Sequence, residues 1–213
     1  EFGIDGVVVD KLAFNWEKVK GRSKRITRKL TAGVNFLLKK NGVELIDGVA
    51  RIGTDRSVWV GDRRITAGQI IIATGSRPKP MGDAFLDAPV VEMERLFEQE
   101  SFPENIVVTG NHVSTVEMAQ FFRLIGRRVT LVTNSNYFLD GLDAYLVEEV
   151  TRRLASDKIE LIKEGYPEKY AEGHLVVGDK KIKCELIVNC NSRKAVIPES
   201  EAPLQLTDRG FIK

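Results

Sequence analysis

The sequence predicts an α/β protein whose second half is built on a parallel sheet. Strand-like apolar runs at 105–109, 128–133 and 159–163 alternate with helical patterns at 113–125 and 142–155. Strands that alternate with helices of about 10–15 residues are typical of βαβ units, in which the strands are parallel. The chain has 213 residues, of which 43% are hydrophobic and 29% are charged, so it can bury a core of ordinary composition.

The first part of the chain is predicted to contain one long helix and several short strands. A helix is expected over 16–40, because its apolar residues recur at helical spacing on one face: Ile26, Leu30, Val34, Leu37 and Leu38. Asn41-Gly42 then supplies a left-handed stop. Strand-like runs follow at 43–46, 49–52, 57–60 and 63–66. Gly61-Asp62 is expected to join the last two in a tight hairpin.

The apolar run Ile70-Ile-Ile-Ala73 ends in the small residues Thr74-Gly-Ser76. This pattern is typical of a buried parallel strand whose carboxyl end meets a ligand. Prolines at 78, 80 and 89 mark a crossing between domains, and a short helix is expected over 93–99. Residues 175–190 are predicted to form a hairpin that turns at Gly178-Asp179 and has a long second arm.

The two cysteines, Cys184 and Cys190, lie six positions apart on that arm. A strand rises about 3.3 Å per residue, which places their Cα atoms roughly 20 Å apart. A disulfide requires less than about 7 Å. We therefore expect free thiols in a reducing compartment, the cytoplasm or another.

The charge balance argues against a dedicated nucleic-acid binder, since the formal net charge is only +2. We interpret the one basic cluster as the solvated face of a helix rather than a phosphate-binding patch. It comprises Lys18, Lys20, Arg22, Lys24, Arg25, Arg28 and Lys29. No apolar run approaches the length that spans a bilayer. Neither nucleic acid nor a membrane is expected as a partner.

One motif carries chemistry, at the place where the strand 105–109 turns into a helix. A dinucleotide-binding turn, G-x-G-x-x-G, is expected at such a place, but here only Gly110 keeps its glycine, while His112 and Thr115 replace the other two. The imidazole adds bulk where a pyrophosphate would approach, and Thr115 is expected to hold the helix away from the sheet. The helix N-terminus still offers free N–H groups and a positive dipole end. Weakened and retained nucleotide binding both remain open.

The residues at the end of the second strand normally distinguish NAD from NADP. An acidic residue there bonds the ribose 2′-hydroxyl of NAD, whereas a nearby Arg accommodates the 2′-phosphate of NADP. This chain has Thr133-Asn-Ser135, which is neither, and Thr133 can donate one neutral hydrogen bond. Arg127 and Arg128 lie at the opposite end of the strand. NAD is the marginal preference.

Six segments, taken in order, carry a resemblance to a known family. They are Leu37-Leu-Lys-Lys-Asn-Gly-Val-Glu-Leu45, Asp47-Gly-Val-Ala-Arg-Ile52, Gln69-Ile-Ile-Ile-Ala-Thr-Gly-Ser-Arg-Pro78, Phe102-Pro-Glu-Asn-Ile-Val-Val-Thr-Gly110, Leu139-Asp-Gly-Leu-Asp143 and Thr207-Asp-Arg-Gly-Phe-Ile-Lys213. The chain resembles the interior of the pyridine nucleotide–disulfide oxidoreductases, which include dihydrolipoamide dehydrogenase and the glutathione and mercuric reductases. The resemblance implies a Rossmann-like NAD-binding domain (85–192) inserted in a partial, split FAD-binding domain (1–84), with a return segment at 193–213.

The resemblance also implies positions for the cofactors. Those near FAD would be Ala50, Thr74, Gly75 and Ser76. Those near the nicotinamide nucleotide would be Gly110, Asn111, His112, Val113, Ser114, Thr115, Glu117, Thr133 and Asn191. Glu117 keeps the family's carboxylate beside the nicotinamide, whereas Asn191 and Ser192 stand where the family has glycine and arginine.

The implied activity is electron transfer between NAD(H), FAD and a dithiol or disulfide substrate. The redox-active cysteine pair, the first flavin glycine motif and the His–Glu pair of the family have no counterpart in this sequence, so no catalytic residue and no metal ligand is assigned and the chain is expected to be catalytically incomplete. Two alternatives stay open: a non-catalytic module that binds NAD or an anion, and a cofactor-free interaction protein. A split domain exposes sheet edges and apolar surface, so a homo-oligomer is expected.

Overall fold

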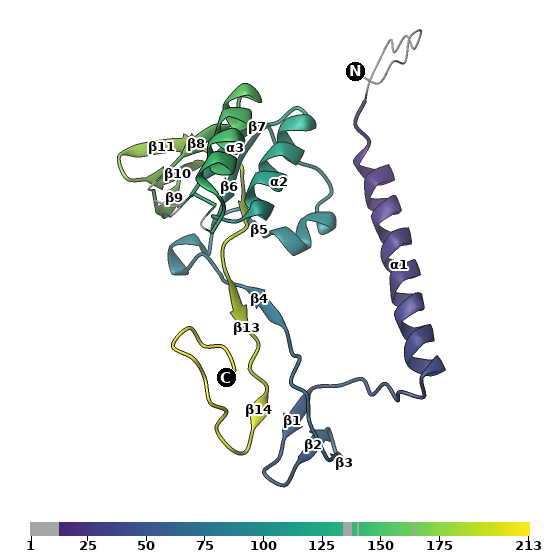
Figure 1. The fold of residues 1–213 in the computed structure, drawn as a ribbon. Helices are drawn as coiled ribbons and strands as arrows, with labels where there is room; N and C mark the ends of the chain where they lie inside the picture. The colour runs from purple at the N-terminus through teal and green to yellow at the C-terminus, as the bar shows by residue number, and fades with distance from the viewer. Residues whose placement is uncertain (1–12, 134–137, 140, 164) are drawn as a thin grey trace.

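A computed structural model describes residues 13–133, 138–139, 141–163 and 165–213 (Figure 1). The largest element is a five-stranded sheet of order β5-β12-β6-β7-β8, in which every neighbouring pair is parallel. Its strands are β5 (Val90–Glu92), β6 (Asn105–Thr109), β7 (Arg128–Val132), β8 (Glu160–Ile162) and β12 (Leu186–Asn189). The parallel sheet predicted from strand–helix alternation is therefore confirmed.

The two faces of this sheet are covered differently. Ile106 and Val108 of β6 belong to a core cluster with residues of α2 (Val113–Leu124) and α3 (Ala144–Ser156). Val107, between them, belongs to a second cluster with Leu175 of an antiparallel ribbon. Successive strand residues point to opposite faces, which explains why an uninterrupted apolar strand is needed here.

The ribbon has the order β11-β10-β9, and its strands are β9 (Pro167–Ala171), β10 (His174–Val177) and β11 (Lys180–Lys183). The turn predicted at Gly178-Asp179 is confirmed, with Gly178 at φ 56°. The prediction that the hairpin has a long second arm is wrong, because the chain leaves the ribbon after Lys183 and enters the parallel sheet as β12. At this break the Glu185 N–H bonds the carbonyl of Asn105 on the parallel sheet, at 2.9 Å. Strands β5 and β9 were not predicted.

Helix α1 (Trp16–Lys40) has the bounds that its pattern predicts. Asn15 accepts the Lys18 N–H at 2.9 Å, and at the other end the Val43 N–H bonds the carbonyl of Leu38. Trp16 is its one buried residue among those described, while the apolar stripe lies exposed from Ile26 to Leu37 and Leu38 is half-buried. Figure 1 shows α1 extending away from the parallel sheet.

Trp16 anchors the start of α1 to the parallel-sheet part of the chain. Its ring lies 4.8 Å from that of Phe102 and 5.3 Å from that of Phe97, and its Nε1–H donates to the carbonyl of Gln99 at 2.8 Å. None of the helices in the described part of the chain combines the length and apolar character needed to cross a bilayer.

A small sheet of order β14-β1-β2-β3 lies beyond the parallel sheet. Its strands are β1 (Ala50–Ile52), β2 (Ser57–Val60), β3 (Arg63–Thr66) and β14 (Glu199–Ser200). The β2–β3 hairpin through Gly61, at φ 58°, is confirmed. The strand expected over 43–46 is wrong, since that stretch is irregular.

The strand expected over 70–73 is also wrong. The stretch is irregular, Ile71 is 90% exposed, and the strand β4 (Ser76–Pro78) begins only after it. A buried parallel strand needs partners for its N–H and C=O groups, and no strand among the described residues runs beside this stretch. The helix expected over 93–99 is a 3-10 helix, Met93–Glu98, and a shorter one covers Asp83–Phe85.

Candidate nucleotide-binding site

A cleft of about 990 Å³ opens at the carboxyl ends of β6 and β12. The chain continues from β6 to β7 on one side, whereas β12 joins on the other, so this is the point where the strand order reverses. Ligands of open α/β sheets bind at such a point. The lining residues come from five separate segments: Ser76, Pro78 and Lys79; Met93 and Glu94; His112 and Ser114; 189–194; and Arg209 with Phe211.

Gly110 lies two residues before His112 of the cleft lining and has no room for a side chain. Its φ is 146°, and its N–H bonds the carbonyl of Val132 at 3.1 Å. A Cβ on Gly110 would lie 2.5 Å from the carbonyl oxygen of Cys190 and 2.6 Å from Oγ1 of Thr115. The first glycine of the motif therefore has the structural task that the turn predicts, because β6, β12 and α2 converge on it.

Thr115 does not hold α2 away from the sheet as expected, since α2 packs on both β6 and β7. Its side chain is fully buried, and its Oγ1 accepts the N–H of His112 at 3.3 Å. The threonine thus uses its hydroxyl to satisfy an N–H at the helix start. The expectation failed because it treated Thr115 only as bulk and not as a hydrogen-bond acceptor.

The N-terminal end of α2 borders the cleft through its N-cap residue His112 and through Ser114. His112 and Ser114 line it, Val113 is exposed, and Glu117 lies exposed one turn further along the helix, outside the lining. The N-terminal end of a helix offers unpaired N–H groups and a positive dipole end to an anion.

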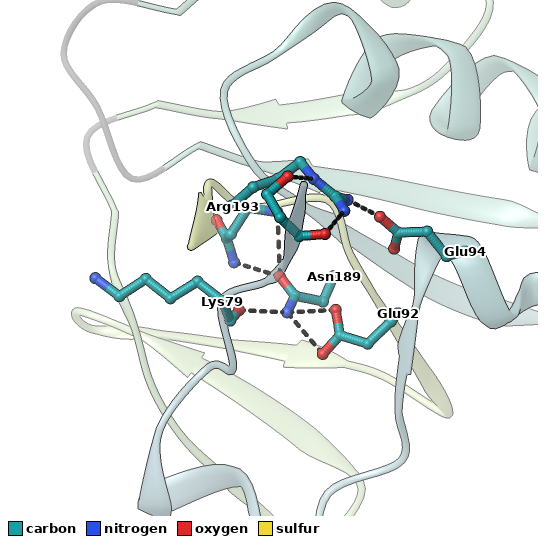
Figure 2. A network of polar contacts seen from close by, with 7 residues as sticks. Lys79, Glu92, Glu94, Asn189 and Arg193 are labelled. Carbon is teal, nitrogen blue, oxygen red and sulfur yellow. Dashed lines mark hydrogen bonds and ion pairs between the residues drawn. The ribbon is translucent and has the colours of Figure 1, made fainter. Parts of the chain in front are cut away.

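Asn189, at the end of β12, organises the opposite wall (Figure 2). It is 2% exposed, and its Nδ2 donates to both Glu92 carboxylate oxygens, at 2.8 and 3.0 Å, and to the carbonyl of Lys79 at 3.0 Å. Its Oδ1 accepts from the backbone N–H of Asn191 at 3.1 Å and from its Nδ2 at 2.7 Å. Asn191 also donates to Oγ1 of Thr109, at 3.2 Å. The side chain of Asn191 is thereby fixed at the cleft wall.

Arg193 links the two segments through which the chain enters and leaves the parallel-sheet part, next to this wall. Its guanidinium donates to Oγ and the carbonyl of Ser76, each at 2.7 Å, and forms an ion pair with Glu94 (Figure 2). It begins β13 (Arg193–Ala195), which pairs antiparallel with β4.

The charged side chains of the cleft lining are predominantly basic. Lys79, Arg193, Lys194 and Arg209 line it, while Glu94 is the one carboxylate among its described lining residues and is already paired with Arg193. With His112 and the start of α2, this arrangement favours a ligand that carries phosphate.

A different contact occupies the gap between the ends of β6 and β7. The side-chain oxygen of Asn111 accepts from Oγ1 of Thr133 at 3.3 Å and from the N–H of Leu139 at 2.9 Å. Thr133 is 0% exposed. The hydroxyl of Thr133, which can donate one hydrogen bond, donates it to Asn111 in this structure. Asn134 and Ser135, which follow it, lie outside the described residues.

The residues expected near FAD are only partly brought together. Thr74 donates its hydroxyl to the carbonyl of Val196 at 2.5 Å, and the carbonyl of Gly75 accepts the N–H of Val196 at 3.0 Å. Ser76 lines the cleft, whereas Ala50 lies in the small sheet, opposite Val60.

Both cysteines are free, as predicted, and the structure buries both of them. Burial raises the pKa of the Cys184 thiol to about 11 and that of Cys190 to about 12. Both side chains therefore carry a neutral thiol at physiological pH and are poor nucleophiles. The described residues contain no group of three or more His, Cys, Asp or Glu side chains placed to hold a metal ion.

The motif located the Gly110–Thr115 turn, but the basic residues of the cleft were missed. Lys79, Lys194 and Arg209 stand in segments whose local patterns carry no site signal. Asn189 did carry a sequence signal, since this polar residue closes the otherwise apolar run Leu186-Ile-Val.

The parallel sheet, the glycine turn and the cleft at the strand-order reversal define a Rossmann-like α/β protein. Residues 3–213 match the family described as pyridine nucleotide-disulphide oxidoreductase. The chain belongs to this family, and its fold is a Rossmann-like domain inserted in a partial, split domain of the FAD-binding type.

Relatives support the assignment. The chain is 31% identical over 167 residues to a dihydrolipoyl dehydrogenase of Acholeplasma laidlawii, covering 76% of this chain and 49% of the relative. It is 30% identical over 158 residues to a glutathione reductase of a Nostoc species, covering 74% and 34%. Its fold is similar to that of the HOCl-induced flavoprotein disulfide reductase RclA from Escherichia coli, with a TM-score of 0.70 at 20% identity over 89% of this chain and 48% of that one. The chain thus spans half or less of the length of these relatives.

Proposed function

We propose that this chain supplies the nicotinamide-nucleotide part of a FAD-dependent disulfide oxidoreductase of the dihydrolipoamide dehydrogenase type. The parent protein would pass electrons between NAD(H), FAD and a dithiol or disulfide substrate. The observation that carries the proposal is the basic cleft at the carboxyl ends of β6 and β12, bounded by the start of α2.

The cleft residues fit the phosphate and nicotinamide end of a dinucleotide. A phosphate would meet the N–H groups at the start of α2, together with Lys194 and Arg209. Asn191, held by Asn189, offers a fixed amide at the wall. The bound nucleotide would supply the hydride, while the described residues would bind and orient it.

FAD is proposed as the second cofactor, with Ser76 on the cleft wall as the best-placed of the four candidate residues. We propose domain boundaries at 1–84, 85–192 and 193–213. The pairing of β4 with β13 supports them, since the chain would enter and leave the nucleotide domain through adjacent strands.

The chain alone is proposed to be catalytically incomplete. Its two thiols are buried and protonated at neutral pH, so neither can attack a disulfide in the family's manner. Buried free thiols also fit a reducing compartment such as the cytoplasm. We propose neither nucleic acid nor a membrane as a partner.

A second candidate is a non-catalytic module that binds NAD or another anion. The replacement of two motif glycines combined with a basic cleft favours it. A cofactor-free interaction protein has one supporting feature, the exposed apolar stripe on α1, which together with the exposed Ile71 also supports a homo-oligomer.

Titration of the chain with NADH, followed by its fluorescence, tests the proposal. Binding is expected, and Arg209→Ala should weaken it by about tenfold, equivalent to about 1.4 kcal/mol. Lys181→Ala is the matched control, because it removes one positive charge from an exposed position on the distant strand β11.

Equal effects of the two substitutions would count against the cleft as the site. Purification without bound flavin, with no diaphorase turnover, is also expected. A flavin-loaded, active preparation would overturn the view that the chain is catalytically incomplete.

A further inference from the structure

We infer that the cleft takes its ligand through the nicotinamide mononucleotide half alone, because this chain's own Asn111 fills the place of the adenosine ribose. The inference rests on the proposed function and specifies which part of the nucleotide is recognised. It assigns Asn111 as the residue that determines this specificity.

In Rossmann-like domains the ribose of the adenosine half is held at the end of the second strand, beside the glycine turn. In this chain that place lies between Asn111 and Thr133, and the two side chains bond each other at 3.3 Å. Thr133 is completely buried, so no ribose hydroxyl reaches its Oγ1.

Asn111 is also fixed by the backbone behind it. Its Oδ1 accepts the N–H of Leu139 at 2.9 Å, and both Phe138 and Leu139 are buried in the core cluster that contains α2 and α3. A ribose in this place would have to break the hydrogen bonds of Asn111 with both Leu139 and Thr133, which is an unfavourable exchange.

The other half of the site is open. The cleft of about 990 Å³ lies on the β12 side of β6, and its lining includes His112, Ser114 and Asn191 but neither Asn111 nor Thr133. Its basic residues are on the same side. The site therefore has an open half with cations for one phosphate and a closed half where the second ribose would sit.

The ligand class that fits is a pyridine nucleoside monophosphate, with or without an adenylate attached to its phosphate. The adenosine half of a dinucleotide then remains outside the site. NADH and NADPH differ only by a phosphate on the adenosine ribose, so the chain should not distinguish them.

A ligand series on the unaltered chain tests the inference without any variant. Reduced nicotinamide mononucleotide, NADH and NADPH should bind with dissociation constants within about threefold of one another, and AMP should bind more than about tenfold more weakly. NADH binding more than tenfold tighter than the mononucleotide, or AMP competing as well as the mononucleotide, would overturn it. Failure of all the nicotinamide ligands to bind would refute the proposed function itself.

A pair of variants then tests the assigned residue. Asn111→Gly removes the side chain and should make NADH bind about tenfold tighter than the mononucleotide. Asn111→Asp keeps an acceptor for Thr133 and Leu139 and should bind the two ligands equally. Thermal unfolding of each variant establishes that it is folded, and a folded Asn111→Gly chain that still binds both ligands equally would show that Asn111 is not the block. If the glycine variant does not fold, the ligand series on the unaltered chain decides.

Discussion

Replacing Gly110 by alanine tests whether the convergence of β6, β12 and α2 depends on one missing side chain. The backbone conformation, at φ 146°, is one that L residues rarely adopt and costs about 1–3 kcal/mol. The added Cβ would lie 2.5 and 2.8 Å from the carbonyl oxygen and carbon of Cys190, which belong to the backbone and cannot rotate away. Such overpacking adds about 1–3 kcal/mol. We therefore expect a total destabilisation of about 2–6 kcal/mol from the two sources.

Gly126→Ala provides the matched control. Gly126 follows α2 at φ 86°, and an added Cβ there meets no atom within 4 Å, so only the backbone cost of about 1–2 kcal/mol remains. Urea unfolding followed by circular dichroism measures both, with thermal midpoints as a check at about 2–4 °C per kcal/mol. Gly110→Ala should lose clearly more stability than Gly126→Ala. Equal losses would refute the steric argument, and no loss at Gly110 would refute the whole account of the turn.

Three further predictions concern other parts of the chain. Cys184 and Cys190, with pKa values raised by burial to about 11 and about 12, should not react with a thiol reagent at pH 8 until urea unfolds the protein, and labelling of the native chain would contradict this. Hydrogen bonds from the side chain and backbone of Asn105 hold the pKa of Glu185 below its ordinary 4.5, so this contact stabilises the fold above pH 4.5 and is lost as the pH falls below it. Glu185→Gln should flatten the decline of the urea midpoint in that range, and an unchanged decline would argue against the contact. Gly33→Ala should stabilise α1 by about 1 kcal/mol, because an added Cβ meets nothing within 4 Å. The thermal midpoint of the helical circular dichroism signal measures this, and a midpoint below that of the unaltered chain would disprove it.

The elements that could be predicted from the sequence are those whose start and stop signals lie in neighbouring residues. Helix α1 runs over the expected residues because its caps are adjacent to it, with Asn15 at one end and Asn41-Gly42 at the other. The hairpin through Gly61 was equally local. The run at 70–73 was not, because an apolar pattern predicts burial only when another strand supplies the hydrogen bonds, and that depends on distant segments.

The site shows the same division. The Gly110 turn is a contiguous motif, and it lies where the pattern placed it. The basic wall is assembled from Lys79, Lys194 and Arg209, which only the closing of the fold brings to one cleft. The contacts of Asn111 were missed for a related reason: its partners Thr133 and Leu139 lie beyond the next helix and strand.

The pairing of β1 with β14 has a consequence for the order in which the chain folds. Arg51 lies opposite Glu199, so the whole parallel sheet is synthesised between these two partners. All five strands of the parallel sheet leave the ribosome before β14 does, and domains generally fold as units during synthesis. Once that domain is compact, β4 and β13 lie side by side, which shortens the effective loop that β1 and β14 must close. We expect the small sheet to be the last part of the chain to mature, and its unpaired edge to be the surface that a nascent chain exposes longest.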